Sequence, residues 1–242
     1  MKIAGSGTIA AGEYNEEISV CGSGKINGNV SCTEFKCSGA VKAVGDIVCA
    51  GEAKISGTMR TEGNIKAESL KVSGTCTVDK GVTVKGDVVL SGNLKVGENL
   101  KCSEIAVGGG LNVGADVEAE TIKIDGTVQC GGLMNAEKIE IRLEHSENKI
   151  SSIGGSEISV YPGKTSFVNK VPILSKIVGC KLGVLEVEES IEGDSVSITS
   201  VKCPSIVGRV VKIGADCEID VVKYSEEVTV DPEAKVGKCE KI

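Results

Sequence analysis

The stretch Gly63-Asn64-Ile65-Lys66-Ala67-Glu68-Ser69-Leu70-Lys71-Val72-Ser73-Gly74 carries the pattern that decides the fold. Apolar and polar residues alternate in Ile65-Lys66-Ala67 and again in Leu70-Lys71-Val72. Alternation with a period of two is typical of a half-buried β-strand. Strands this short, separated by glycine or polar residues, do not suit a conventional sandwich. They suit a coil in which each turn is built from several short strands.

The same pattern recurs at intervals of 17 or 18 residues. A first series consists of Gly5, Gly22, Gly39, Gly57, Gly74, Gly92, Gly109 and Gly126. A second series, in step with it, consists of Val30, Ile47, Ile65, Val82, Leu100 and Val117. Two residues beyond these lie Cys32, Cys49, Ala67, Val84, Cys102 and Ala119. A repeat of this length predicts an all-β fold, a parallel β-helix in which equivalent residues stack about 4.8 Å apart.

The composition agrees with a narrow core of small, stackable side chains. The chain has 32 Val and 23 Ile against 10 Leu, and β-branched residues favour strands. The chain has no Trp, three Tyr and two Phe, which agrees with a narrow core that has little space for rings. A triangular coil with three faces is expected. The recurring glycines are expected at corners where the backbone takes a positive φ.

Charge and hydropathy restrict the partners and the location. The net charge is −7, without a basic face, and five aromatic residues do not make base-stacking platforms, so no nucleic acid is expected as a partner. No stretch approaches the roughly 18 apolar residues of a membrane span. The N-terminal residues 1–7 lack the apolar core of a signal peptide, which predicts a cytoplasmic protein.

The regularity of the repeat predicts three segments. Residues 1–143 are expected to form a regular β-helix, 144–176 an irregular insertion or loop, and 177–242 a less regular β-helical continuation. The middle segment contains Tyr161, Pro162, Phe167 and Pro172, which suit a packed loop. Strand character returns in Val196-Ser197-Ile198, Val211-Lys212-Ile213 and Val228-Thr229-Val230, which are 15 and 17 residues apart. Whether this last segment stacks on the first or forms a domain of its own stays open.

The N-terminal repeats resemble those of bactofilins, the polymer-forming bacterial cytoskeletal proteins. The resemblance rests on Val20-Cys21-Gly22-Ser23-Gly24-Lys25-Ile26-Asn27-Gly28-Asn29-Val30 and on the stretch 63–74, and covers roughly residues 1–140. The last third, with Gly208-Arg209-Val210-Val211-Lys212-Ile213-Gly214 and Val222-Lys223-Tyr224-Ser225, is similar to the longer bactofilin-like proteins of Gram-positive bacteria.

This resemblance implies a right-handed β-helix whose ends join into filaments without a nucleotide, and which acts as a scaffold for cell-shape or envelope machinery. Many bactofilins carry disordered Pro-rich tails and a short N-terminal membrane-binding segment. This chain enters its repeats by Ile3, so association with a membrane is expected only through partner proteins.

Self-association is the interaction that the pattern predicts. The end of a β-helix has unpaired strand edges and an exposed cross-section of its core, and it recruits another chain unless a cap covers it. The candidate contact residues are Ile3, Ile9 and Ile18 in the first turn and Val228, Val230 and Val236 in the last. The first turn is expected to present an open apolar end, whereas Pro232 and the charged residues 238–241 are candidates for blunting the other end.

No catalytic, cofactor-binding or metal-binding residue is expected. Eleven cysteines without a Cys-x-x-Cys pair, together with the single His145, do not make a common zinc site. Cys32, Cys49, Cys102 and Cys130 fall on inward series and are expected to be buried, reduced thiols.

Two alternatives to the filament-forming scaffold share its repetitive shape. One is a regulator that does not polymerise and docks a partner protein through a coil face, similar to the C-terminal domain of the division inhibitor MinC. The other is a hexapeptide-repeat acyltransferase. That family keeps a strict six-residue period and uses a histidine as general base, whereas this chain alternates 17 with 18 and has His145 in an unremarkable context.

Overall fold

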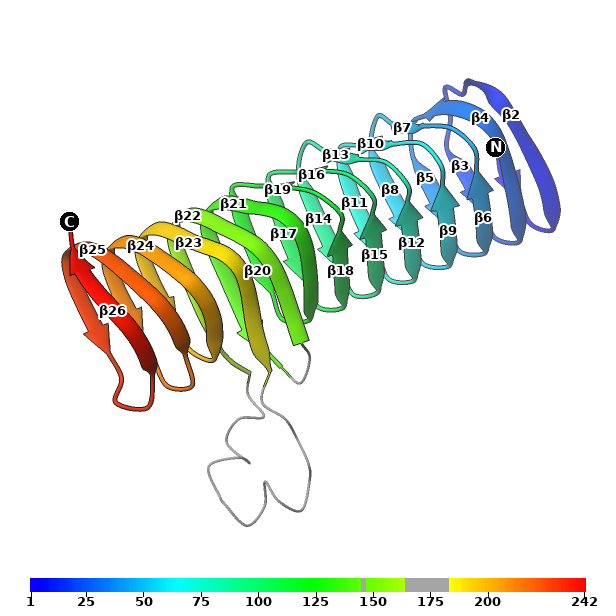
Figure 1. Ribbon diagram of the computed structural model, residues 1–242. Coiled ribbons are helices and arrows are strands. Elements are labelled where there is room, and N and C mark those ends of the chain that lie inside the picture. Colours follow the sequence, from blue (N-terminus) through cyan, green and yellow to red (C-terminus); the bar gives the residue numbers. More distant parts are fainter. Residues whose placement is uncertain (145–146, 164–182) are drawn as a thin grey trace, which may run out of the picture. The chain divides into compact units, whose positions relative to one another are not determined.

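Every strand pairing in the structure is parallel, and the described residues contain no helix (Figure 1). The computed structural model describes residues 1–144, 147–163 and 183–242. The chain divides into two compact units, Met1–Ala119 and Glu120–Ile242. Both units are parallel β-solenoids, so the predicted all-β fold is confirmed.

The first unit is built from short strands. Its strands are β1 (Lys2–Ile3), β2 (Ser6–Glu13), β3 (Ile18–Val20), β4 (Ser23–Cys32), β5 (Phe35–Cys37), β6 (Ala40–Ala43), β7 (Ile47–Cys49), β8 (Glu52–Ile55), β9 (Thr58–Thr61), β10 (Ile65–Ala67), β11 (Ser69–Val72), β12 (Thr75–Val78), β13 (Val82–Val84), β14 (Asp87–Leu90), β15 (Asn93–Val96), β16 (Leu100–Lys101), β17 (Glu104–Val107), β18 (Gly110–Val113) and β19 (Val117–Glu118).

Three of these strands make one turn. The chain passes through β7, β8 and β9 and then returns, so that β10 pairs with β7. Ile65 has Ile47 as its partner on one side and Val82 on the other. These partners are 18 and 17 residues away, which confirms the period read from the sequence and the three-sided turn.

The core of the first unit is a stack of equivalent inward residues. Ile65 is 1% exposed, whereas its neighbour Lys66 lies on the outer surface. Among the described residues Phe35 is the largest fully buried side chain, and its register partner in the next turn is Ala53. A ring fits into this narrow core because a small residue lies beside it.

The repeated glycines allow successive turns to approach each other closely. The expectation that these corner residues have a positive φ is wrong. Among the described glycines only Gly12 and Gly28 have φ values in the positive region. At Gly74 an added Cβ would lie 2.0 Å from the carbonyl oxygen of Gly57 in the preceding turn. The corner is therefore restricted to glycine because any side chain would collide with the backbone of the turn beside it.

A row of Asn and Asp residues closes another corner of the first unit. The row consists of Asn29, Asp46, Asn64, Asn99 and Asp116, each directly before a residue of the second apolar series. The Oδ1 atom of Asp46 accepts hydrogen bonds from the backbone N–H of Asn64 (2.7 Å) and from its side-chain amide (3.0 Å). The Oδ1 atom of Asn64 accepts one from the N–H of Gly81 (3.2 Å). These bonds satisfy corner N–H groups that no strand partner reaches.

Replacing Asn64 with Ala is expected to lower the free energy of unfolding by about 1–2 kcal/mol. The variant loses the acceptor for the Gly81 N–H group and the donor to Asp46. The urea midpoint, followed by circular dichroism, measures the change, and Lys66→Gln on the outer surface of the same turn is the control. Equal midpoints for the two variants would show that the corner row does not contribute to stability.

Asp46 is expected to make the stability of the first unit depend on pH. The backbone N–H and then the side-chain amide of Asn64 stabilise the carboxylate, which lowers the pKa of Asp46. Its contribution is therefore fully present above the unfolded-state pKa of about 3.9 and is lost as the pH falls through the lower folded-state value. Asp46→Asn keeps the acceptor but does not titrate. The stability difference between wild type and this variant is expected to shrink on acidification, and a difference that is constant with pH would contradict this.

The second unit has fewer and longer strands. They are β20 (Thr121–Ile124), β21 (Thr127–Leu143), β22 (Glu147–Pro162), β23 (Val184–Ile198), β24 (Val201–Ile213), β25 (Glu218–Val230) and β26 (Lys235–Lys241). Val211 pairs with Val196 on one side and with Val228 on the other, as the spacing of 15 and 17 predicts. The register shifts within each of the pairs β21–β22, β22–β23, β23–β24 and β24–β25, which confirms a less regular C-terminal part.

Part of the interval expected to be irregular forms a strand. Strand β22 occupies Glu147–Pro162 and includes Tyr161, whose register partner is Arg142. His145, Phe167 and Pro172 lie outside the described residues, as do all of residues 164–176 of the predicted insertion. The division into segments 1–143, 144–176 and 177–242 stays a prediction.

The cysteines are mostly core residues. The eight buried thiols in the described residues are Cys32, Cys37, Cys49, Cys76, Cys102, Cys130, Cys203 and Cys217, and the exposed ones are Cys21 and Cys239. Burial raises the pKa of Cys76 and of Cys102 to about 12. The prediction that Cys32, Cys49, Cys102 and Cys130 face inward is confirmed.

Thiol titration is expected to distinguish two thiols that react fast from eight that react slowly. A thiol reagent has to reach the sulfur atom, so a thiol buried in the core reacts slowly with a bulky reagent. Cys180 lies outside the described residues, so the experiment uses a Cys180→Ser variant. At neutral pH Cys21 and Cys239 are expected to react at once, and the others only after denaturation. Rapid labelling of most thiols in the native protein would contradict the buried placement.

Candidate self-assembly site

The last turn of the second unit has an unpaired edge. Strand β26 pairs with β25 over Glu218–Tyr224. On the β26 side, residues 227–230 of β25 have no strand partner within the described part of the chain, whereas on the other side they pair with β24. An unpaired edge presents free N–H and C=O groups to which another strand can add. Residues 238–241 belong to β26, so they extend the sheet and do not form a charged tail.

Core side chains are exposed at this edge. Ile213 and Val230 are register partners on the inward side of successive turns. Ile213 is 2% exposed, but Val230 is 38% exposed because nothing in the described residues covers the last turn. Val228 and Val236 are half-buried for the same reason. The structure therefore presents a cross-section of its core at the C-terminal end.

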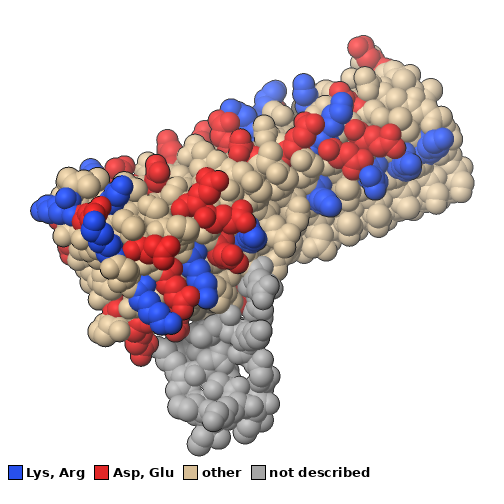
Figure 2. All heavy atoms as spheres, viewed as in Figure 1, with Lys and Arg blue, Asp and Glu red and all other residues tan. Residues whose placement is uncertain are grey.

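Oppositely charged side chains pair with one another on the last turns of this unit. The carboxylate of Glu218 lies 2.7 Å from the Lys202 ammonium and 2.9 Å from that of Lys235. These two ammonium groups lower the pKa of Glu218 to about 2. Acidic and basic side chains alternate over the turns near the C-terminus (Figure 2). Because these acidic and basic side chains are paired with one another, they oppose the approach of a second chain less than unpaired charges of one sign would.

The first turn of the N-terminal unit is covered. Ile9 is 1% exposed and Ile18 is fully buried, while Ile3 is half-buried. The hydroxyl of Tyr14 donates a hydrogen bond to the carbonyl oxygen of Ala10 (2.9 Å), so this side chain folds back along the turn. Ile9 and Ile18 are core residues here and do not form the open apolar end that was expected.

The edge strand of this turn also carries a bulge. The register between β2 and β4 shifts between Ala10 and Gly12, where Gly12 has a φ of 155°. Bulges on edge strands disfavour the addition of a further strand. The two ends thus differ: the N-terminal end is covered and bulged, and the C-terminal end exposes apolar side chains. The roles of the six candidate residues in self-assembly stay a prediction.

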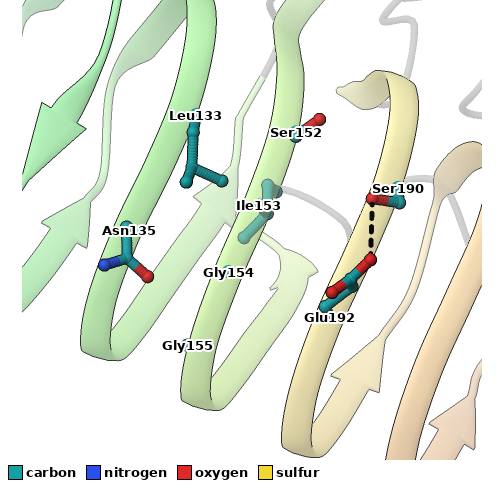
Figure 3. A pocket seen from close by; sticks show the side chains of 8 residues that line it. All are labelled: Leu133, Asn135, Ser152, Ile153, Gly154, Gly155, Ser190 and Glu192. Carbon is teal, nitrogen blue, oxygen red and sulfur yellow. Dashed lines mark hydrogen bonds between the residues drawn. The ribbon is translucent and has the colours of Figure 1, made fainter.

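A second candidate site is a shallow groove of about 510 Å³ on the outer side of β21, β22 and β23 (Figure 3). It arises because Gly154 lies between Asn135 and Glu192 in one outward row, which leaves a gap between two side chains. The Ser190 hydroxyl donates a hydrogen bond to Glu192 (3.5 Å). Glu192 is the one titratable residue of the lining, so the groove has no pair of groups for acid–base catalysis.

The described residues show neither a metal cluster nor a spanning helix. Groups of three or more His, Cys, Asp or Glu residues that could hold a metal ion do not occur among them. A helix long and apolar enough to cross a membrane is likewise not found in the part of the chain that the structure describes.

Comparison with known proteins agrees with the repeat pattern and the solenoid. Residues 1–79 match the bactofilin family. The family is described as polymer-forming and cytoskeletal. The resemblance that the N-terminal repeats predicted is thus confirmed over these residues.

Two relatives from Bacillus subtilis are similar to this chain. It is 31% identical over 113 residues to the uncharacterized protein YhbE, and this match covers 46% of this chain and 44% of YhbE. It is 28% identical over 111 residues to the uncharacterized protein YhbF, and this match covers 46% of this chain and 42% of YhbF. The match thus spans less than half of each relative. No solved structure gives a significant match.

The corner row and the unequal ends are the features that sequence reasoning missed. The corner row had a signal, because Asn29, Asp46 and Asn64 follow the same spacing of 17 and 18 as the apolar series. The difference between the two ends had no signal in the sequence, since Ile9 and Val230 are both apolar residues in alternating segments.

Proposed function

We propose that this protein is a structural scaffold that assembles end to end into filaments without a nucleotide. The observation that carries the proposal is the exposure of Val230 beside half-buried Val228 on an unpaired strand edge. Association would bury these side chains and pair the free backbone groups. The match of residues 1–79 to a polymer-forming family supports it.

The unequal ends imply an order of assembly. Contact between exposed apolar side chains at the C-terminal end is expected to form first, because it removes apolar surface from water. Growth into an open filament also needs a contact at the N-terminal end, since association through one end alone gives a closed pair. That second contact would use the outer edge of β2 before the bulge, over Ser6–Ala10.

The scaffold is proposed to act without catalysis, cofactor or metal. It would work in the cytoplasm, support cell-shape or envelope machinery, and reach a membrane through partner proteins. The outer surface of the first unit offers regular rows for such partners. Lys54, for example, lies between Lys36 and Lys71 in register.

Sedimentation and negative-stain electron microscopy of the purified 242-residue chain test this function. Filaments that pellet equally with and without ATP, GTP or a metal chelator are the expected result. A protein that remains a monomer or dimer at all concentrations would overturn the proposal. That outcome would favour the regulator that docks a partner through a coil face.

A further inference from the structure

Two thiols of successive turns face each other inside the first unit. Cys32 ends strand β4 and Cys49 ends strand β7, and the two residues are register partners. Their Sγ atoms are 3.7 Å apart. Each residue is only 5% exposed, so both thiols are buried in the first unit.

We propose that Cys32 and Cys49 form a reversible disulfide when the protein meets a peroxide, and that this bond fastens two successive turns to each other. Neighbouring strands lie about 4.8 Å apart, which falls in the range of about 4.4–6.8 Å that Cα atoms of disulfides span. The sulfur atoms need to approach to about 2.0 Å and the Cβ atoms to about 3.5–4.5 Å, which requires rotation of both side chains and a small approach of the two strand ends. A movement of this size leaves β4 and β7 paired in the same register.

The environment distinguishes the two sulfurs. A hydrogen bond from the Cys49 thiol stabilises the Cys32 thiolate and lowers the pKa of Cys32. The same bond, together with burial, raises the pKa of Cys49. Cys32 is thus the nucleophile and Cys49 the resolving thiol, because the thiolate is the form that attacks a peroxide.

The reaction has two balanced steps. The Cys32 thiolate attacks one peroxide oxygen, the O–O bond breaks, and Cys32 becomes a sulfenic acid while the other oxygen leaves as water after protonation. The Cys49 sulfur then attacks the Cys32 sulfur, and the sulfenic oxygen leaves as a second water with the proton of Cys49. Two thiols and one hydrogen peroxide give one disulfide and two waters. An external dithiol reverses the change by thiol–disulfide exchange.

Cys102 provides a matched comparison within the same chain. It occupies the same inward series as Cys32 and Cys49, and it is 8% exposed. Its neighbours along that series are Val84 and Ala119, so it has no sulfur beside it. Alanine is tolerated in this series at Ala67, which is 5% exposed, so a Cys→Ala change at either position is expected to preserve the turn.

The test uses a full-length variant in which Cys21, Cys180 and Cys239 are replaced by Ser, which removes the exposed thiols and the one outside the described residues. After treatment with hydrogen peroxide, intact mass spectrometry is expected to show the loss of two hydrogen atoms. Peptide mapping is expected to link Cys32 to Cys49. The thermal midpoint is expected to rise by several degrees and to return after dithiothreitol.

In this background Cys49→Ala is expected to abolish both the mass loss and the rise in midpoint, whereas Cys102→Ala is expected to keep both. A native protein that does not react, or that only gains oxygen, would overturn the proposal. The same holds if the mass loss persists in Cys49→Ala. None of these readouts depends on filament formation.

Discussion

Ile65→Asp is expected to unfold the N-terminal unit, while Lys66→Asp leaves it folded. Ile65 is 1% exposed between Ile47 and Val82, so the new carboxylate would be buried between apolar side chains of two turns. Burying an unpaired charge costs several kcal/mol, a large part of the roughly 5–15 kcal/mol that stabilises a typical domain. Because each turn of a solenoid is stabilised by its two neighbours, this loss also removes support from the turns on both sides.

Circular dichroism and thermal unfolding measure the contrast. Lys66 is the matched control because it is adjacent in the same strand, points outward and receives the same new residue. It is expected to shift the thermal midpoint by no more than a few degrees. Similar midpoints for the two variants would mean that the inward and outward positions of β10 are misassigned.

Val230→Asp is expected to abolish filaments and to leave the fold intact. Val230 is already 38% exposed, so the carboxylate can remain hydrated in the isolated chain. In an assembled filament the same carboxylate would be buried against the apolar edge of another copy. Desolvation of an unpaired charge opposes that contact by several kcal/mol, enough to lower an association constant more than a hundredfold.

The control for this variant is Thr229→Asp. Thr229 precedes Val230 in β25 and is exposed on the outer side, so the change adds the same charge beside the contact and not within it. Sedimentation is expected to show pelleted filaments for Thr229→Asp and none for Val230→Asp, with equal circular dichroism. Normal filaments from Val230→Asp would remove the C-terminal edge from the assembly mechanism.

Because Ile9 is buried, a variant at the N-terminal end tests the folding of the first turn as well as assembly. From the sequence alone, Ile9→Arg is expected to affect only a contact between chains. Since Ile9 is 1% exposed, the arginine would disrupt the first turn itself. Loss of assembly in this variant is therefore informative only if its circular dichroism and thermal midpoint match those of the wild type.

The fold was largely predictable because a solenoid converts position along the chain directly into position in space. Residues 17 or 18 apart become neighbours, so the partners of Ile65 follow from counting. The function of the corner glycines did not follow. The pattern shows that Gly74 lacks a side chain, but only the structure shows that the Gly57 carbonyl oxygen fills that space.

The sequence by itself determined the period, the inward and outward positions, and the narrow aliphatic core, because these depend on local alternation and on the spacing of equivalent residues. Tertiary structure alone decided which end is covered. Ile9 and Val230 belong to the same kind of apolar series, yet a folded-back Tyr14 and a bulged strand accompany one, while the other lies at an unpaired edge. Exposure at the end of a stack depends on what lies beyond the last turn, and no repeat within the stack contains that information.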